Sequence, residues 1–427
     1  MKFILTLFLS LILCFSTLVH TGNAQTINRC FLKTTYDSTD DSSTNITSNT
    51  KTKQESDNVS QNINVPSLPL SSSSALLMDA DTGTILYEHN ADKTLPLASV
   101  TKIMSLLLIF QALDSGKIQL KDSVTISAQA ASMGGSQVYL EEGEVQTVET
   151  LIKCIVIASA NDACVAMAEL ISGSEDAFVQ KMNTMAESLG MTQTHFANCC
   201  GLDCNNHYST ARDIAVMSRE LTTKHPDIFD YTSIWMEDIT HHTSRGNTTF
   251  TLSNTNHLIK QYAYATGLKT GFTSTAGFCL SATACKDGLN LIAVVLHAPS
   301  SKERITDVKN LFEWGFANCQ VYTDENTDIL PEIPVSRGQL SLLTIKYKST
   351  FRYLDIADTV GELSKNLKLP DEIKAPIHKD DVIGKAVYTL NGVTVGSVDL
   401  IAAESIPLLT LKDTWMQILS RFLLSNI

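Results

Sequence analysis

The sequence predicts an α+β protein in which an antiparallel sheet is flanked by helices and a smaller all-β domain follows. Apolar strand patterns occupy 264–271, 277–285 and 289–297, and Asp287-Gly288 marks a tight turn between the last two. Strands joined by such short connections pair antiparallel, so the three form a meander. Helical apolar spacing is common in the chain before them, which favours helices packed against this sheet.

The amino-terminal residues carry the pattern of an export signal. Lys2 is followed by an apolar run and then by small residues at 22–24, so residues 1–24 are predicted to be a signal peptide. The alternative is a retained membrane anchor, because the run is near the lower length limit for crossing a bilayer. Residues 25–65 are rich in Ser, Thr, Asn, Asp and Gln, and we expect a disordered polar linker there.

The larger domain is predicted to span 66–318. It begins with a hairpin pattern at 75–87, and a first helix follows over 99–113. Two further helical patterns, 147–157 and 163–171, are separated by a short polar connection. These helices supply the layer that covers the predicted sheet.

The connection between those two helices contains Ser159 and Asn161, and Asp162 follows directly. Asp is a favoured N-cap residue, so Asp162 is expected to cap the second helix. A little further on, Ser209 or Thr210 can cap a helix that runs to about Thr222.

The pattern changes near residue 318, after a closing helix predicted over 304–316. Residues 319–410 show short alternating strands, and Asn391-Gly392 is the strongest hairpin signal of the chain. We therefore predict a β-rich C-terminal domain.

The last residues, 411–427, differ again from that domain. One face of a helix built from them would carry Trp415, Ile418, Leu419 and Phe422. This amphipathic helix is too short to cross a bilayer, and we expect it to associate with a membrane surface. Docking on the β-rich domain is the alternative.

Three short motifs stand in order along the larger domain: Ser99-Val100-Thr101-Lys102, Ser159-Ala160-Asn161 and Lys269-Thr270-Gly271. A serine and a lysine three residues apart share one face of a helix, where the amine can take the hydroxyl proton as the oxygen attacks. One such tetrapeptide arises easily by chance, as a capped helix with a solvated lysine. All three in this order form the motif set of serine β-lactamases and penicillin-binding proteins.

From about Ser71 to its end, the chain resembles the low-molecular-mass penicillin-binding proteins, the D-alanyl-D-alanine carboxypeptidases of peptidase family S11. Besides the motifs, the segments that carry the resemblance are 96–98, 207–213, 254–256, 272–273, 276–277 and 304–316. The resemblance implies a β-lactamase/DD-peptidase-like catalytic domain, a β-rich C-terminal domain and a terminal helix on the membrane. It also implies cleavage of the terminal D-alanine from peptidoglycan stem pentapeptides, inhibition by β-lactam antibiotics, and a place at the cell wall or the outer face of the cytoplasmic membrane.

The resemblance and the chemistry of the side chains together imply a catalytic group. Ser99 is expected to attack the carbonyl between the two D-alanines and form an acyl-enzyme. Lys102 is the expected base, and burial beside a second cation, Lys269, favours its neutral form. Ser159 can relay a proton to the leaving amine, and Asn161 can orient Lys102 and bind the substrate amide.

The third motif is expected to bind substrate. Lys269 and Thr270 can hold the free carboxylate of the terminal D-alanine. Gly271 is expected to let the substrate strand approach the backbone, and the N–H groups of Ser99 and Phe272 are the expected oxyanion hole.

Two more positions of the resemblance, His207 and Arg304, are expected near the cleft. A functional role and a packing or capping role both fit each of them.

Two other functions stay open at this point, a serine β-lactamase and a non-catalytic protein that binds the cell wall. A β-lactamase needs fast attack of water on the acyl-enzyme, which one class achieves with a glutamate acting through a water. The sequence holds no Glu-x-x-Leu-Asn pattern to supply one. The intact motifs argue against the non-catalytic alternative.

Composition excludes some partners. The formal net charge of −13 argues against nucleic acid. Cys199, Cys200 and Cys204 lie close in sequence, but they lack the accompanying histidine pair of a zinc site. No metal and no other cofactor is therefore predicted.

Overall fold

The computed structural model describes residues 67–244, 246–356 and 361–415. The predicted signal peptide and the whole of the predicted linker lie outside these residues, as does the part of the predicted terminal helix beyond residue 415. Among the described residues, every helix is too short or too polar to cross a membrane.

The larger domain is built on a sheet of strand order β2-β1-β9-β8-β7. Its strands are β1 (Ser74–Asp79), β2 (Ile85–His89), β7 (Ala265–Thr273), β8 (Gly277–Lys286) and β9 (Leu289–Ala298). All neighbouring strands pair antiparallel, which confirms the predicted meander and the predicted hairpin. The hairpin joins the meander through β1, which pairs with β9.

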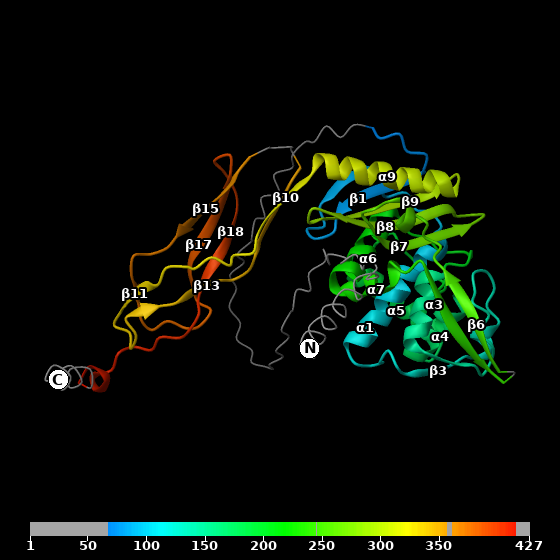
Figure 1. The fold of residues 1–427 in the computed structure, drawn as a ribbon, viewed down its shortest axis with the longest axis horizontal. Helices are drawn as coiled ribbons and strands as arrows, with labels where there is room; N and C mark the ends of the chain where they lie inside the picture. The colour runs from blue at the N-terminus through cyan, green and yellow to red at the C-terminus, as the bar shows by residue number, and fades with distance from the viewer. Residues whose placement is uncertain (1–66, 245, 357–360, 416–427) are drawn as a thin grey trace, which may run out of the picture.

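Helices cover both faces of this sheet, as Figure 1 shows for α9 above it and α1, α3 and α6 below it. The helical elements are η1 (Ala98–Thr101), α1 (Lys102–Asp114), α2 (Ala128–Ala131), α3 (Val148–Ile157), α4 (Asn161–Ser172), α5 (Glu175–Ser188), α6 (Ala211–Lys224), η2 (Pro226–Ile228), α7 (Phe229–Thr232), α8 (Leu258–Gln261) and α9 (Ser301–Asn318). Two short ribbons complete the domain, β3 (Ser123–Thr125) with β4 (Val145–Thr147) and β5 (Met236–Thr243) with β6 (Gly246–Ser253).

Strand alternation divides the core of this domain into two layers. Leu76 and Ile292 pack with the helices around α1, whereas their sequence neighbours Leu77 and Ala293 pack against α9. Successive side chains of a strand point to opposite faces, so a sheet that is apolar on both faces needs helices on both sides.

Thr210 caps α6 by accepting the N–H of Asp213, which settles the choice between Ser209 and Thr210.

Between residues 319 and 410, the described part of the chain forms strands and no helix. Its strands are β10 (Gln320–Asp324), β11 (Ile333–Ser336), β12 (Leu342–Leu343), β13 (Ile345–Tyr347), β14 (Phe351–Asp355), β15 (Leu363–Lys368), β16 (Ile373–Lys374), β17 (Val382–Leu390) and β18 (Val393–Ala402). The Asn391-Gly392 hairpin is confirmed, because Leu390 pairs with Val393 across it. The core of this region includes Phe351 stacked on Tyr388 at 3.6 Å between ring centroids.

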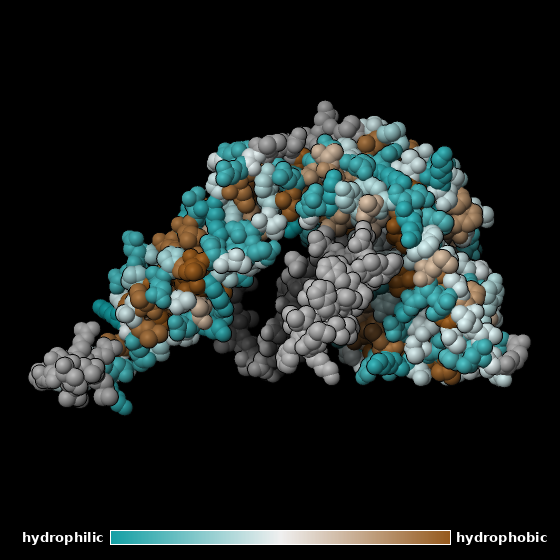
Figure 2. Space-filling view, in the orientation of Figure 1, coloured by the Kyte–Doolittle hydropathy of each residue, from teal (hydrophilic) through white to brown (hydrophobic). Residues whose placement is uncertain are grey.

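The surface of the β-rich domain keeps several apolar side chains, seen as brown patches between teal areas in Figure 2. Its exposed large hydrophobic residues include Leu342, Val382, Val393 and Leu408.

Arg352 of β14 connects this domain to the larger one, with bonds to the Asp79 carboxylate at 3.0 and 3.1 Å and to Asp81 at 2.7 Å.

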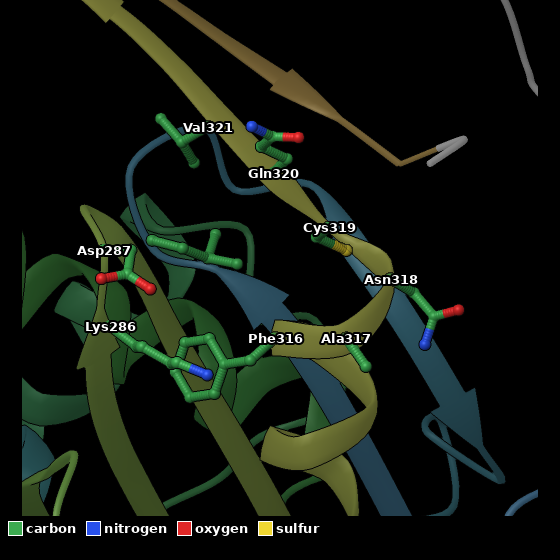
Figure 3. A pocket seen from close by; sticks show the side chains of 9 residues that line it. Lys286, Asp287, Phe316, Ala317, Asn318, Cys319, Gln320 and Val321 are labelled. Carbon is green, nitrogen blue, oxygen red and sulfur yellow. The ribbon is translucent and has the colours of Figure 1, made fainter. Parts of the chain in front are cut away.

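A pocket of about 300 Å³ lies where α9 runs into β10. Lys286, Phe316 and Val321 are among the side chains around it in Figure 3. None of the predicted site residues lines this pocket, so it is a feature of the junction between the domains and separate from the predicted cleft.

Candidate active site

Ser99 lies in the short 3-10 turn η1, which ends directly before α1 begins at Lys102. The α-helix therefore starts three residues later than expected, because residues 98–101 form a 3-10 turn. Ala98, at the start of this turn, has φ +48°. Ser99 is partly exposed, whereas Lys102 is completely buried. Lys102 Nζ lies 3.0 Å from Ser99 Oγ, so the turn and the helix still bring hydroxyl and amine together.

Two further partners hold the Lys102 amine in place. Its Nζ bonds to Asn161 Oδ1 at 2.6 Å and to the carbonyl oxygen of Cys200 at 2.8 Å. Both of these oxygens can only accept a hydrogen bond, whereas the Ser99 hydroxyl can also donate one. When Lys102 is neutral, its lone pair can therefore receive a proton only from Ser99 among these three partners.

Asn161 and Asp162 open α4, which starts two residues earlier than predicted. The expectation that Asp162 caps this helix was wrong, because the N-cap position belongs to Ala160. The Asp162 carboxylate instead accepts the N–H groups of Val138 and Leu140, both at 3.1 Å. These bonds hold a neighbouring loop against the start of α4.

Asn161 is fixed by that same loop. Its Nδ2 donates to the Gly134 carbonyl at 2.7 Å and its backbone N–H donates to Ser136 O at 2.8 Å. With Nδ2 engaged in this way, Oδ1 faces Lys102. Ser159, two residues earlier, is buried and has φ +61°. A strained backbone of this kind is common at functional sites.

The third motif lies on β7, the strand at the end of the sheet order. Lys269 is 1% exposed, and its Nζ donates to the Thr270 carbonyl at 3.1 Å. Burial, then the nearby charges of Lys102 and Arg304, lower the pKa of Lys269 well below its usual value. Thr270 is also buried, and its hydroxyl contacts that of Thr255 at 2.8 Å.

Gly271 packs directly against the turn that carries Ser99. A Cβ at this position would lie 2.9 Å from Leu97 O and 3.0 Å from Ser99 N. We expected this glycine to make room for substrate, and the structure shows that it makes room for η1. Phe272 follows with 56% of its surface exposed, stacked on Phe278 at 4.3 Å.

His207 supports the first motif from behind. Its Nδ1 accepts the Ala197 N–H at 3.0 Å, so its Nε2 carries the proton and donates to Thr101 Oγ1 at 2.7 Å. Burial, followed by the charge of His195, lowers the pKa of His207 to about 4. The imidazole is therefore neutral near pH 7 and acts on the position of Thr101.

Arg304 supports the third motif in the same way. Its Nη1 donates to Cys279 O at 3.1 Å and to Gly271 O at 3.3 Å. Burial lowers the pKa of Arg304 to about 10. For both His207 and Arg304 the structure shows a supporting contact with the motif backbone or side chain.

Sequence reasoning missed the segment around Gly201. A Cβ on Gly201 would lie 1.9 Å from Ala98 O, and its φ is +88°. The preceding residue, Cys200, offers Lys102 a backbone carbonyl, which every residue type carries. The glycine in Gly201-Leu202 was the signal that could have indicated a close approach of two backbones.

The arrangement defines a serine hydrolase site of the penicillin-binding class, in which a buried amine contacts both a hydroxyl and an amide, beside the strand β7 at the end of the sheet order. A sequence profile of the D-alanyl-D-alanine carboxypeptidases, peptidase family S11, matches residues 59–300, and a profile of the penicillin-binding protein 5 C-terminal domain matches 326–408. The chain belongs to peptidase family S11.

Individual proteins agree with this assignment. The chain is 40% identical to D-alanyl-D-alanine carboxypeptidase DacF of Bacillus subtilis, over 78% of this chain and 85% of that protein. It is 32% identical to DacC of Escherichia coli, over 78% of this chain and 83% of DacC. Penicillin-binding protein 5 of Haemophilus influenzae superimposes with a TM-score of 0.65 at 30% identity, over 80% of this chain and 99% of that one. The predicted fold class and family are therefore confirmed.

Proposed function

We propose that this protein is a serine-type D-Ala-D-Ala carboxypeptidase that removes the terminal D-alanine from peptidoglycan stem pentapeptides. The observation that carries the proposal is the contact of 3.0 Å between Ser99 Oγ and Lys102 Nζ. The other two partners of Lys102 are pure acceptors, which leaves the serine hydroxyl as the proton source for a neutral amine.

The reaction begins when Ser99 Oγ attacks the carbonyl carbon between the two D-alanines while its proton passes to Lys102. The N–H groups of Ser99 and Phe272 stabilise the oxyanion. The close approach of the Gly271 backbone to η1, where a Cβ on Gly271 would lie 3.0 Å from Ser99 N, supports this role because it brings the two segments together. Collapse of the intermediate breaks the peptide bond, and the leaving D-alanine amine takes a proton through Ser159. Water then hydrolyses the ester.

Lys269 and Thr270 bind the carboxylate of the terminal D-alanine in this proposal. The lowered pKa of Lys269 means that the empty site disfavours a second full charge near Lys102. An arriving carboxylate supplies the missing counter-charge and favours the ammonium of Lys269. A free carboxylate at the chain end thereby becomes a requirement, which makes the enzyme an exopeptidase.

The decisive experiment combines two measurements on the purified protein. A stem pentapeptide should release free D-alanine, and penicillin should give one adduct per chain, located by digestion on the peptide that contains Ser99. Ser99→Ala should show neither, while keeping its fold, since Ser99 is partly exposed and its loss costs little stability. An adduct that persists in Ser99→Ala would place the nucleophile elsewhere, and rapid loss of the adduct with hydrolysed drug accumulating would indicate a β-lactamase.

A substrate pair tests the role of Lys269. Amidation of the terminal carboxylate removes the ionic partner, so turnover should fall by an order of magnitude or more, as expected for a charge-assisted contact of about 1.5–3 kcal/mol. Lys269→Ala should discriminate little between the two peptides. Equal turnover of both peptides by the wild type would refute the carboxylate contact.

The same proposal includes export and a place on the outer face of the cytoplasmic membrane. Residues 411–415 are helical, and Leu411 and Trp415 are 83% and 70% exposed, which supports contact with a lipid surface through the terminal helix. Truncation after Lys412 should release the protein from lipid vesicles without lowering activity on a soluble peptide. Equal vesicle binding by both forms would reject the anchor.

A further inference from the structure

Three buried thiols form a cluster directly behind the Lys102 amine. Cys164 comes from α4, and Cys199 and Cys200 come from the segment before Gly201. Their Sγ atoms all lie within 4.8 Å of one another, and the Cys199 and Cys200 sulfurs are 3.5 Å apart. All three residues are at most 1% exposed, and the proposed reaction uses none of their sulfurs.

The grouping differs from the one that the sequence indicates. Cys199, Cys200 and Cys204 lie close along the chain, but Cys204 is exposed and its sulfur accepts a hydrogen bond from Asn198 at 3.3 Å. The third member of the cluster is instead Cys164, 35 residues before Cys199, which donates its S–H to the Cys199 carbonyl at 3.2 Å. The fold thus creates a three-sulfur group that no local spacing reveals.

The separations suit coordination of one ion. Zinc binds thiolate sulfur at about 2.3 Å, so two sulfurs of a tetrahedral site lie about 3.8 Å apart. The Cys199–Cys200 pair already lies at 3.5 Å, and the remaining pairs need to close by at most about 1 Å from their upper limit of 4.8 Å. Thiolate ligands select soft or borderline metals over magnesium and calcium.

We propose that Cys164, Cys199 and Cys200 bind one thiophilic divalent cation, of which zinc and cadmium are the examples. Binding replaces three S–H protons, which leave to solvent, and the resulting tris-thiolate complex carries one net negative charge. The amine of Lys102, bonded to the Cys200 carbonyl at 2.8 Å, is positioned to balance that charge.

A bound ion would also act on the site through the backbone. The Cys200 carbonyl accepts from Lys102, and the Cys199 carbonyl accepts from Ser105 Oγ at 2.7 Å. Fixing the two sulfurs therefore fixes the peptide that orients the first turns of α1. An ion that binds only the folded protein raises its stability by mass action.

The test uses the full chain, reduced and freed of metal under an inert atmosphere, with the cadmium ion alone as probe. Titration should give a sulfur-to-cadmium charge-transfer band in the ultraviolet that saturates at one ion per chain, together with a rise in Tm. Cys164→Ala should weaken binding by at least about tenfold, because losing a ligand costs no less than losing an outer-shell partner. Cys204→Ala should bind as the wild type does.

A second buried thiol controls for damage to the core. Cys154 lies in α3, is fully buried and does not belong to the cluster, so Cys154→Ala should keep the band and its affinity. X-ray absorption of the zinc-loaded wild type needs no variant and should show a sulfur shell at about 2.3 Å. A shell of nitrogen and oxygen only, absence of the band at one equivalent, or unchanged affinity in Cys164→Ala would each overturn the proposal.

Discussion

The two domains bury different kinds of side chain. The larger domain encloses charged side chains that are at most 5% exposed, among them Lys102, Lys269, Arg304 and Asp162. In the described part of the β-rich domain, Asp355 is the buried polar residue, and aromatic and aliphatic side chains fill the rest of the core. Burying a charge is costly unless it is hydrogen-bonded. In the larger domain, backbone carbonyls, backbone N–H groups and side-chain amides therefore bind the buried charged groups.

The difference shows what a reactive site demands of a fold. In the larger domain, segments far apart in sequence are held together by bonds to buried polar groups, such as Lys102 with Cys200, 98 residues apart. The β-rich domain is held by strand pairing, both in hairpins such as β17 and β18 and between distant strands such as β13 and β18. Equivalent substitutions in the two domains should therefore have unequal effects, and the following experiments measure that inequality.

The largest difference is expected for a pair of lysines. Lys102→Ala should lower the rate of acylation by penicillin about 10²–10⁴-fold, because it removes the general base. Lys346→Ala, a half-exposed lysine of β13 that pairs with Asp380, should leave the rate unchanged. Rates are measured per folded molecule by intact mass, and a Lys102→Ala rate within threefold of the wild type would contradict the assigned role.

A pair of glycines comes next. Gly201→Ala forces a Cβ to 1.9 Å from Ala98 O and should destabilise the larger domain by about 4 kcal/mol or prevent it from folding. Gly392→Ala in the β-rich domain has a similar φ of +81° but no atom within 4 Å, so only the strain of about 1–2 kcal/mol applies. Denaturant unfolding of both variants measures the difference. Equal losses of unfolding free energy would show that backbone strain, and not the clash with Ala98 O, causes the destabilisation.

A pair of histidines, one in each domain, should differ in its effect on the pH dependence of stability. The pKa of His207 is about 4 in the folded protein against 6.5 as its ordinary value, so unfolding takes up a proton between these limits. The stabilisation from neutral His207 is complete above pH 6.5 and is lost as the pH falls toward 4. At pH 5 the loss is about 2 kcal/mol.

His207→Gln should remove this part of the pH dependence, whereas His378→Gln, on the surface of the β-rich domain, should not. Urea unfolding of the three proteins at pH 7 and pH 5 gives the comparison. An unchanged slope in His207→Gln would mean that another group takes up the proton.

The smallest effect is expected at the contact between the domains. Arg352→Ala should cost about 1 kcal/mol, because the buried Asp79 keeps hydrogen bonds from the N–H and hydroxyl of Thr82. Lys348→Ala, which removes a surface pair with Asp399, should cost less. Unfolding followed with one spectroscopic probe in each domain should show two separate transitions in Arg352→Ala, while acylation by penicillin is retained. A single transition at the wild-type position would mean that other contacts couple the two domains.

The parts that sequence predicted share a local cause. Turn residues such as Asn391-Gly392 determine hairpins, and the motif pair Ser99 and Lys102 meets through the geometry of one helical turn. The wrong expectation for Asp162 has a long-range cause, since its carboxylate meets Val138 and Leu140 from another segment. Backbone acceptors such as Cys200 O are invisible in sequence, because all residues carry the same carbonyl.

The bonds of Lys102 have a consequence for following how this chain folds. Asn161 and Cys200, which bind the amine, lie 59 and 98 residues from Lys102 along the chain. The nucleophile is therefore activated only after distant segments have met. Proteins dominated by such distant contacts fold slowly. A pulse of labelled penicillin at successive times of refolding would therefore label only the molecules whose catalytic domain is complete. The labelled fraction against time would give the rate of the last steps of folding.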